Sequence, residues 1–599
     1  MYILGISCYY HDAAACLLKE GNLIAAAQEE RFSRIKHDSS FPQGAVDFCL
    51  KQAGISSRDL DLVVFHEKPF LKFERIIKTV LATYPRSFKL FSEVAVNWLQ
   101  DKLWIKSKIS DFLDIAEDKI LFCEHHISHA AASLFCSSFK ETAVLTVDGV
   151  GEWSTTTLGR GTAAWEEGEK NSIEILQEIR FPHSLGLLYS VFTAFLGFKV
   201  NNGEYKVMGM SAFGKPRYVD KIYKLINVNP DGSFSLNMEY FSYHYSTRKS
   251  FNKNFISLFG EPRKAESRFV VSRDTLIYEG EAIEDEEIEK SLHYADIAAS
   301  IQKVTEDIMI KIANHLYDLT GIKNLCMGGG VSLNCVSNNR LLNETPFENI
   351  FIQPASGDSG AALGGALYAW HAMLNKKRKF ILEHVYWGEE HSNEEIRGFL
   401  RDRKIPYKKF EEEEELIDYV SDLLIKQKII GWFQHKFEWG PRALGNRSIL
   451  SDPRDPRMKD IINVKIKFRE PFRPFAPSVI YEGVSKLFDI EDVKDQYPFR
   501  FMLYTIDSPS GLIPAATHVD GTSRIQIVHK EINPLYYALI DDFYRKTGVP
   551  AVLNTSFNLR GEPIVNTPQE AFATFTKSGI DAIVLNNFVV EKPFNRTSG

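Results

Sequence analysis

Short apolar runs alternate with turn residues at the start of the chain. The runs Tyr2–Ser7, Ala14–Lys19 and Leu23–Gln28 each have the length of a strand, and a Glu20-Gly21-Asn22 turn separates the last two. Short aliphatic runs bounded by turn signals are typical of β-strands. The pattern therefore predicts three consecutive strands at the beginning of the chain.

The same pattern returns later in the chain. Apolar runs at Ala143–Val147 and Ser154–Leu158 flank the segment Asp148-Gly149-Val150-Gly151. This second strand–acid–glycine–strand unit predicts a duplicated α/β domain, in which each half offers a polar turn to a shared cleft.

Longer segments differ in periodicity and composition. Phe112–Ala130 and Ser291–Leu319 have a mainly helical pattern. Residues 216–290 are polar, aromatic-rich and irregular, as is typical of an insertion. We expect a helix after the glycine-rich stretch 357–365, and a basic break at 376–379 marks a change of composition.

Length and charge limit the class of protein. A chain of 599 residues is too long for one hydrophobic core, and the basic break gives domains 1–379 and 380–599. The net charge of −7 offers no general attraction to nucleic acid. No apolar run reaches the roughly 18 residues of a membrane span. The seven cysteines form no C-x-x-C pair and the start lacks signal-peptide features, which predicts a cytoplasmic protein with reduced thiols.

Two histidines and two acids form a candidate metal site. His125 and His129 are four residues apart, so on a helix their imidazoles share one face. Asp148 follows a predicted strand, and Asp358 lies among small residues. Such a nitrogen and oxygen donor set suits iron(II), manganese or zinc better than calcium. The alternative is that both carboxylates only cap turns.

A glycine-rich run follows the predicted strand Asn324–Met327. Gly328, Gly329 and Gly330 precede Asn334, and glycines let backbone N–H groups converge on a phosphate. The run matches neither common nucleotide-binding motif, so a tight structural turn stays open. Lys206, in a separate segment, has the length to reach a phosphate.

Cations and small polar residues gather in the second half. Arginine forks bind phosphate, and aromatic rings stack on a base. Because the chain is not strongly basic, a nucleotide-sized anion is favoured over the alternative, a single-stranded nucleic acid. The residues are Arg442, Arg447, Lys467, Arg469, Arg473, His518, Arg524, Ser556 and Asn558.

Several segments together resemble the O-carbamoyltransferase family of nodulation protein U and of the tobramycin, cephem and ansamycin enzymes. The resemblance covers nearly the whole chain. The segments that carry it are Tyr10–Ala13, Glu29–Phe32, His125–Ala130, Glu204–Gly209, Gly440–Ser448, Arg469–Pro477 and Asn554–Asn558.

The resemblance implies a fold and an activity. Domain 1–379 would have a duplicated actin-like ATPase fold similar to the tRNA threonylcarbamoyl transferase. Domain 380–599 would be a YrdC-like α/β domain, whose K-x-R and S-x-N pattern matches Lys467-Phe468-Arg469 and Ser556-Phe557-Asn558. The implied reaction converts carbamoyl phosphate and ATP into carbamoyl-adenylate in the second domain. The first domain then transfers the carbamoyl group to a small-molecule hydroxyl.

The resemblance also assigns roles to residues. His11 and His37 are the candidates for the acceptor-side base, and Arg442, Lys467 and Arg473 would neutralise phosphate charge. The metal would be iron(II), held by His125, His129, Asp148 and Asp358. The expected nucleotide and phosphate contacts are Gly149, Gly151, Lys206, Gly328, Gly329, Gly330, Asn334, Arg447, Arg469, His518, Arg524, Ser556 and Asn558.

The motifs leave the acceptor open. An aminoglycoside, a cephem, an ansamycin, a nodulation factor and a saxitoxin-like alkaloid all carry suitable hydroxyls, and a homodimer also stays open. One rival function is tRNA threonylcarbamoylation, which uses the same two folds. A hydrogenase-maturation enzyme is disfavoured because C-x-x-C pairs are absent. A nucleotide-binding sensor without catalysis is the rival from another class.

Overall fold

The chain divides into two compact units. The computed structural model describes residues 1–100, 102–273, 283–489 and 496–592. Unit 1 comprises Met1–Glu29, His37–Arg273 and Ile283–Leu382. Among the described residues, unit 2 comprises 30–36 and those from Glu383 onward.

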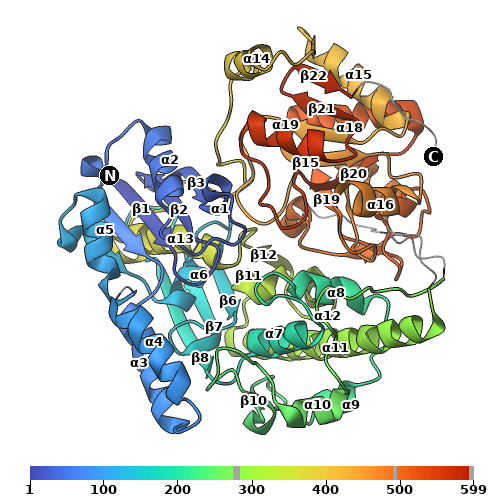
Figure 1. Ribbon diagram of the computed structural model, residues 1–599. Coiled ribbons are helices and arrows are strands. Elements are labelled where there is room, and N and C mark those ends of the chain that lie inside the picture. Colours follow the sequence, from blue (N-terminus) through green and yellow to red (C-terminus); the bar gives the residue numbers. More distant parts are fainter. Residues whose placement is uncertain (101, 274–282, 490–495, 593–599) are drawn as a thin grey trace. The chain divides into compact units, whose positions relative to one another are not determined.

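Unit 1 contains two five-stranded sheets built on one plan (Figure 1). The strand order is β3-β2-β1-β4-β5 in the first sheet and β8-β7-β6-β11-β12 in the second. In each sheet the first three strands pair antiparallel and the last two join parallel. The repeated order confirms the predicted duplication. The strands are β1 (Tyr2–Ser7), β2 (Ala14–Lys19), β3 (Asn22–Gln28), β4 (Leu62–Phe65), β5 (Ile120–Phe122), β6 (Glu141–Val147), β7 (Ser154–Thr162), β8 (Ser172–Arg180), β11 (Asn324–Gly328) and β12 (Asn349–Ile352).

Two helices lie between these sheets (Figure 1). Helix α13 (Asp358–Tyr368) packs on β1 and β2, and α6 (His125–Leu134) packs on β6 and β11. The helices also pack on each other, since a Cβ at Gly364 would lie only 1.8 Å from a backbone oxygen of α6. A Cβ at Gly5 would lie 2.0 Å from a backbone oxygen of α13. Glycine is therefore needed at both positions, and this packing brings the first turns of α6 and α13 into one site.

Other helices cover the outer faces. Helix α2 packs on β2 and β3, while α7 packs on β7 and α11 packs on β6 and β7. Helix α11 contains the predicted helix 291–319, which is confirmed. Segment 216–273 forms short elements, as expected of an insertion, and 274–282 lie outside the described residues. The helices are α2 (Gln43–Ala53), α7 (Leu185–Phe195), α11 (Asp285–Thr320) and α12 (Cys335–Glu344).

Two predicted elements differ from the structure. The helical pattern over 112–130 is wrong in part, because strand β5 interrupts it between α5 (Ile105–Leu113) and α6. The stretch 357–365 is not followed by a helix but lies at the start of one, α13. Within this helix Gly364 allows close packing on α6.

Unit 2 is built on one mixed sheet of eight strands, in the order β13-β22-β21-β14-β15-β20-β16-β19. Helices α14 (Asn393–Asp402) and α19 (Pro568–Lys577) share one hydrophobic core with it, and α15 (Glu413–Ile425) packs on α18 (Pro534–Thr547). The strands are β13 (Lys408–Lys409), β22 (Phe588–Glu591), β21 (Ala582–Leu585), β14 (Ile430–Phe433), β15 (Arg447–Ser451), β20 (Ala551–Ser556), β16 (Ala476–Ile480) and β19 (Gln526–Val528).

A short early segment belongs to unit 2. It includes helix α1 (Glu30–Ser33), whose Arg31 is buried and donates to the Gly440 carbonyl at 3.0 Å. Arg34 donates to the carbonyls of Ile564 at 2.8 Å and Pro563 at 3.0 Å. Residues 30–36, which lie inside the expected domain 1–379, are thus part of the second unit.

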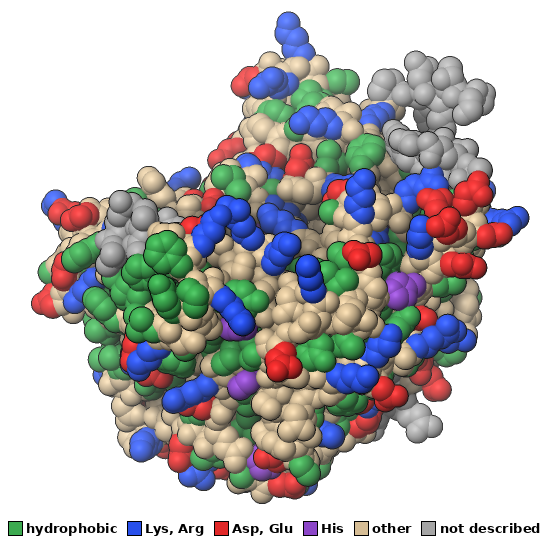
Figure 2. Space-filling model, turned by 60° about the horizontal axis from the view of Figure 1, so that its bottom comes forward, with side chains coloured by type: hydrophobic (Ala, Val, Ile, Leu, Met, Phe, Trp, Pro, Cys, Tyr) green, Lys and Arg blue, Asp and Glu red, His purple; other side chains and the backbone are tan. Residues whose placement is uncertain are grey.

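No helix in the described ranges combines the length and the apolar character needed to cross a membrane. Figure 2 shows Lys and Arg side chains scattered among hydrophobic and acidic ones on the face it presents.

Candidate functional site

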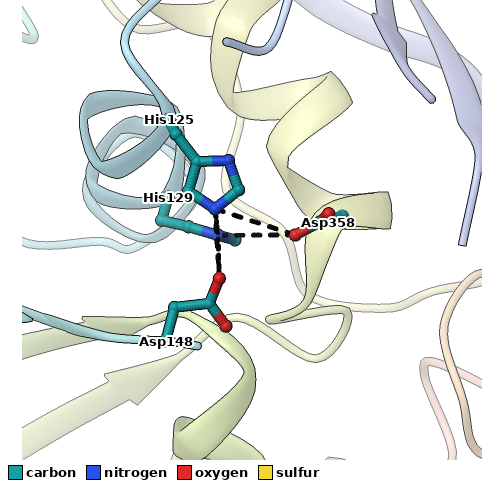
Figure 3. Close-up of side chains that lie close together, drawn as sticks. All are labelled: His125, His129, Asp148 and Asp358. Carbon is teal, nitrogen blue, oxygen red and sulfur yellow. Dashed lines mark hydrogen bonds and ion pairs between the residues drawn. The ribbon is translucent and has the colours of Figure 1, made fainter. Parts of the chain in front are cut away.

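The four predicted metal ligands come together in unit 1 (Figure 3). Helix α6 places His125 and His129 one turn apart, Asp148 follows the end of β6, and Asp358 begins α13. His125 Nε2 lies 3.0 Å from Asp148 Oδ2 and 3.1 Å from His129 Nε2. Asp358 Oδ1 lies 3.8 Å from His125 Nε2 and 3.9 Å from His129 Nε2. The structure thus assembles two nitrogens and two carboxylates around one point.

This donor set fits a divalent cation. All four side chains are buried, and neither oxygen of Asp358 has a hydrogen-bond partner among the described residues. Burial raises the pKa of Asp358 to about 6. Buried polar atoms are normally satisfied, so an unpaired carboxylate beside two converging imidazole nitrogens calls for a positive charge.

Glycines next to the cluster allow this approach. A Cβ on Gly151 would lie 3.0 Å from the Cβ of His125, and one on Gly328 would lie 2.7 Å from the His129 carbonyl oxygen. Gly329 has a φ of +89°, which favours glycine. The Gly330 N–H donates to Asp148 Oδ1 at 2.9 Å. In the described structure this predicted phosphate loop thus contacts a predicted metal ligand, Asp148.

The two histidines proposed as acceptor-side base share one carboxylate. Asp12 Oδ1 lies 2.7 Å from His37 Nδ1, and Asp12 Oδ2 lies 3.1 Å from His11 Nδ1. His11 also faces the metal cluster, with Nε2 3.9 Å from Asp358 Oδ2. Burial lowers the pKa of His11, but Asp358 and then Asp12 outweigh it and bring the pKa to about 10. His11 is therefore the one of the pair that lies beside the cluster.

The backbone of this loop is strained. Asp12 has a φ of +48° and His37 a φ of +56°, values that residues other than glycine rarely adopt. Such conformations cost about 1–3 kcal/mol each and persist where the surroundings impose them. The two residues with positive φ meet through the Asp12 carboxylate, which lies 2.7 Å from His37 Nδ1.

Two other predicted unit 1 contacts, Asn334 and Lys206, have different partners. Asn334 caps helix α12 by accepting from Ser337 N at 3.1 Å, and its amide pairs with Gln302 at 3.0 Å. The Lys206 ammonium lies 5.3 Å from the centre of the Phe198 ring. A Cβ on Gly149, next to Asp148, would make ordinary contacts, 3.9 Å from a Leu187 methyl and 4.0 Å from the Tyr10 hydroxyl.

In unit 2, the predicted lysine, serine and asparagine form one group. The buried Lys467 ammonium donates to the carbonyl oxygen of Ser556 and, at 2.9 Å, to Asn558 Oδ1. Ser556 Oγ donates to Asn558 Oδ1 at 2.7 Å. Two motifs that are distant in sequence thus share a single site.

Arginines surround this group. Burial, followed by the charges of Arg469 and Arg473, holds the pKa of Lys467 well below its usual range. Burial and Arg473 likewise lower the pKa of Arg469, and Arg442 contributes to lowering that of Arg473. Arg524 acts on Arg469 in the same sense. A bound polyanion would relieve this repulsion, so the cluster suits phosphate groups.

Two predicted unit 2 contacts have other partners. The buried Arg447 donates to the carbonyl oxygens of Asn446 at 3.0 Å and His435 at 2.9 Å, and it lies 3.6 Å from the ring centre of Phe433. His518 Nδ1 lies 3.1 Å from Thr522 Oγ1, and burial lowers the pKa of His518 to about 4. His518 is thus neutral near pH 7 and offers phosphate no charge.

Sequence reasoning missed three carboxylates beside the unit 1 cluster. Asp12 joins the two histidines described above, and Glu67 lies behind His125. Glu152 accepts from His125 N at 3.1 Å and from Lys68 N at 2.7 Å, which places negative charge at the start of α6. Asp12 lies in the motif Tyr10–Ala13, and its position directly after His11 could have identified it from the sequence.

The sequence also matches known proteins. The chain is 44% identical to an uncharacterized protein of Synechocystis over 99% of this chain and 97% of that protein. It is 32% identical to the nodulation protein NolNO of Sinorhizobium fredii over 98% and 79%, respectively. A 3'-hydroxymethylcephem-O-carbamoyltransferase of Amycolatopsis lactamdurans is 33% identical over 44% and 48%.

A fold comparison adds little. The crystal structure of HypF from T. kodakarensis covers 62% of this chain and 48% of its own, at 14% identity and a TM-score of 0.30. A score this low supports no conclusion. Family matches are decisive instead: residues 2–367 match the carbamoyltransferase N-terminus and residues 421–592 match the carbamoyltransferase C-terminus. The chain therefore belongs to the carbamoyltransferase family and is a carbamoyltransferase enzyme.

Proposed function

We propose that this enzyme is an O-carbamoyltransferase that uses carbamoyl phosphate and ATP to carbamoylate a hydroxyl of a small molecule. Unit 2 would form carbamoyl-adenylate and unit 1 would transfer the carbamoyl group. The strongest support is the separation of two kinds of chemistry: a phosphate-type cation cluster in unit 2 and a metal-type donor set in unit 1.

Adenylation needs positive charge where phosphates react. Water first cleaves carbamoyl phosphate to carbamate and phosphate. A carbamate oxygen then forms a bond to the α-phosphorus of ATP, and the bond to the β-phosphate oxygen breaks to release pyrophosphate. Lys467, Arg442 and Arg473 would offset the charge that develops on these oxygens. Ser556 and Asn558 hold Lys467 in position for this role.

Transfer needs a base near the adenylate. The acceptor oxygen attacks the carbamoyl carbon, the bond to the AMP phosphate oxygen breaks, and the acceptor proton goes to Nε2 of His11. His11 must be neutral for this step, and a cation bound at the cluster would offset Asp358, the charge that most raises the pKa of His11. Asp12 orients His11 through Nδ1. A cation held by His125, His129, Asp148 and Asp358 would supply positive charge for the nucleotide phosphate; iron(II) is our proposal for its identity.

The two fold assignments are part of this proposal. The repeated strand order in unit 1 supports an actin-like ATPase fold. The contact of Lys467 with Ser556 and Asn558 supports a YrdC-like unit 2. Acceptor hydroxyls of the proposed kind include the hydroxymethyl group named for the cephem relative.

Product formation tests the proposal. Purified enzyme given ATP and carbamoyl phosphate should release AMP and pyrophosphate, and mass spectrometry of a panel of alcohols should find one with a single added carbamoyl group. AMP release that requires threonine and bicarbonate instead would indicate threonylcarbamoylation. ATP binding without carbamoyl-dependent AMP release would indicate a sensor.

A further inference from the structure

A buried ion pair lies directly behind the metal cluster. Glu67 follows strand β4, and Lys72 lies one turn into helix α3 (Pro69–Ala82). Only 7% of the Lys72 side chain and 6% of the Glu67 side chain are exposed, and Lys72 Nζ lies 2.5 Å from Glu67 Oε2. Neither residue belongs to the motifs that carry the family resemblance.

The same carboxylate oxygen faces a metal ligand. Glu67 Oε2 lies 3.8 Å from His125 Nδ1, on the side of the imidazole away from the metal cluster. His125 Nδ1 is buried and has no hydrogen-bond partner among the described residues. A histidine that binds a metal through Nε2 carries its proton on Nδ1 and donates that N–H to a carboxylate, a backbone carbonyl or a water.

A second metal ion at Glu67 is the competing explanation. His66, Glu67 and His125 also lie close enough together to bind one. The Lys72 ammonium, however, already lies at hydrogen-bond distance from Glu67 Oε2 and supplies the positive charge that this pocket needs. Lys72 therefore takes the place that a second cation would occupy.

The ion pair also lies close to the loop that carries His11, the proposed acceptor-side base. Lys72 Nζ lies 4.8 Å from the centre of the Tyr10 ring, and that ring lies 4.9 Å from the ring of His11. Lys72 thus touches the loop that holds the proposed base, while Glu67 faces a proposed metal ligand.

We propose that Glu67, held in place by Lys72, is a positioning residue that moves in from 3.8 Å to accept a hydrogen bond from the Nδ1–H of His125 when a metal binds, and thereby sets the affinity of the metal site. This inference rests on the proposed metal site. Its direct consequence is that the charge of Glu67, and not only its packing, controls metal binding.

Measurements of metal affinity and of thermal stability distinguish a role of the Glu67 charge in metal binding from a role in packing alone. We would titrate the metal-free full-length protein with Co²⁺ against a chromophoric chelator and record thermal unfolding of the metal-free form. Glu67→Gln should weaken Co²⁺ binding by about 10–100-fold. It should also lower the unfolding temperature, because Lys72 is left buried without its partner. Glu74→Gln, on the same helix in an exposed pair with Lys78, is the matched control and should change neither quantity.

The double variant Glu67→Gln/Lys72→Met gives the decisive result. It removes both buried charges, so the unfolding temperature should recover while Co²⁺ binding stays weak. Recovery of Co²⁺ affinity together with stability would show that Glu67 acts only in packing and would overturn the inference. Unchanged Co²⁺ affinity in Glu67→Gln would do the same. If the unaltered protein binds no Co²⁺, both this inference and the proposed metal site fail.

Discussion

At the scale of single residues, the paired imidazoles of His125 and His129 make the metal site testable. Replacing His129 by alanine leaves the two carboxylates with one nitrogen, so the cation should be lost together with transfer activity. Metal content after dialysis, measured by mass spectrometry, checks this result.

His126 supplies the control on the same helix. Its Nδ1 lies 2.6 Å from Thr146 Oγ1, and its side chain is not part of the cluster. Asparagine places an amide close to that Nδ1 position, so His126→Asn should retain the cation. A stoichiometric cation that survives in a His125/His129 double variant would refute the assignment.

Lys467 gives a prediction for adenylation. Lys467→Ala removes the buried ammonium at the centre of the cation cluster, and carbamoyl-dependent pyrophosphate release should fall on the order of 100-fold or more. The variant should still transfer from carbamoyl-adenylate added from outside. Lys465→Ala, two residues away and exposed, is the matched control. Adenylation at the normal rate in Lys467→Ala would place the site elsewhere.

His11 gives a prediction for transfer. Because His11 lies between Asp12 and the metal cluster, His11→Ala should still form carbamoyl-adenylate. Transfer should fall by about 100–10,000-fold, the usual contribution of a general base. A single-turnover experiment should show adenylate accumulating without carbamoylated product. A parallel loss of adenylate formation would exclude His11 as the acceptor-side base.

Candidate residues that form a recognisable sequence pattern could be predicted from the sequence. The partners that a side chain contacts in the folded protein could not. His125 and His129 stood out by their four-residue spacing, which places both imidazoles on one helix face, and Asp148 and Asp358 by their small neighbours. Asn334 and Arg447 have the right chemistry for phosphate, but a helix cap and backbone carbonyls occupy them. Glu67 is one of many acids, and only the fold brings it to His125.

At the scale of elements, the contact between α6 and α13 fixes the geometry of the site. Gly364→Ala would place a Cβ 1.8 Å from a backbone oxygen, so α13 must move. The free energy of unfolding should fall by about 1–3 kcal/mol. Cation affinity should fall too, because Asp358 moves with the helix. Denaturant unfolding and a cation titration measure these effects.

Gly398 in helix α14 is the matched control. A Cβ there meets nothing within 4 Å, so Gly398→Ala should be neutral or stabilising by up to about 1 kcal/mol. Equal stability of the two alanine variants would mean that α6 and α13 are not packed this closely.

Strands were easier to predict than helices in this chain. β1 and β2 begin and end where the apolar runs do, because buried strands leave uninterrupted aliphatic runs. β5 has three residues, too few to show a period of its own, so it was hidden in a helical pattern. The helix expected after 357–365 begins earlier, at Asp358, because glycines inside a helix can serve close packing and do not by themselves mark its start.

At the scale of the whole molecule, the two proposed half-reactions lie in different units. Lys467→Ala lacks the first half-reaction and His11→Ala lacks the second. A mixture of the two variants should form some carbamoylated product. The rate should be low, because the carbamoyl-adenylate must diffuse through water from one protein molecule to another. Product formation in the mixture, measured by mass spectrometry, checks this outcome. Product formation by either variant alone at the normal rate would contradict the assignment of one half-reaction to each unit.

The position of α1 determines how the two units could be produced as separate fragments. A gene fragment that begins at residue 383 would encode the sheet of unit 2 but not Arg31 and Arg34, and the carbonyls of Gly440, Pro563 and Ile564 would lose their donors. A single cut therefore cannot yield an intact second half. A synthetic peptide spanning 30–36, or its fusion to the fragment, would be required to rebuild it.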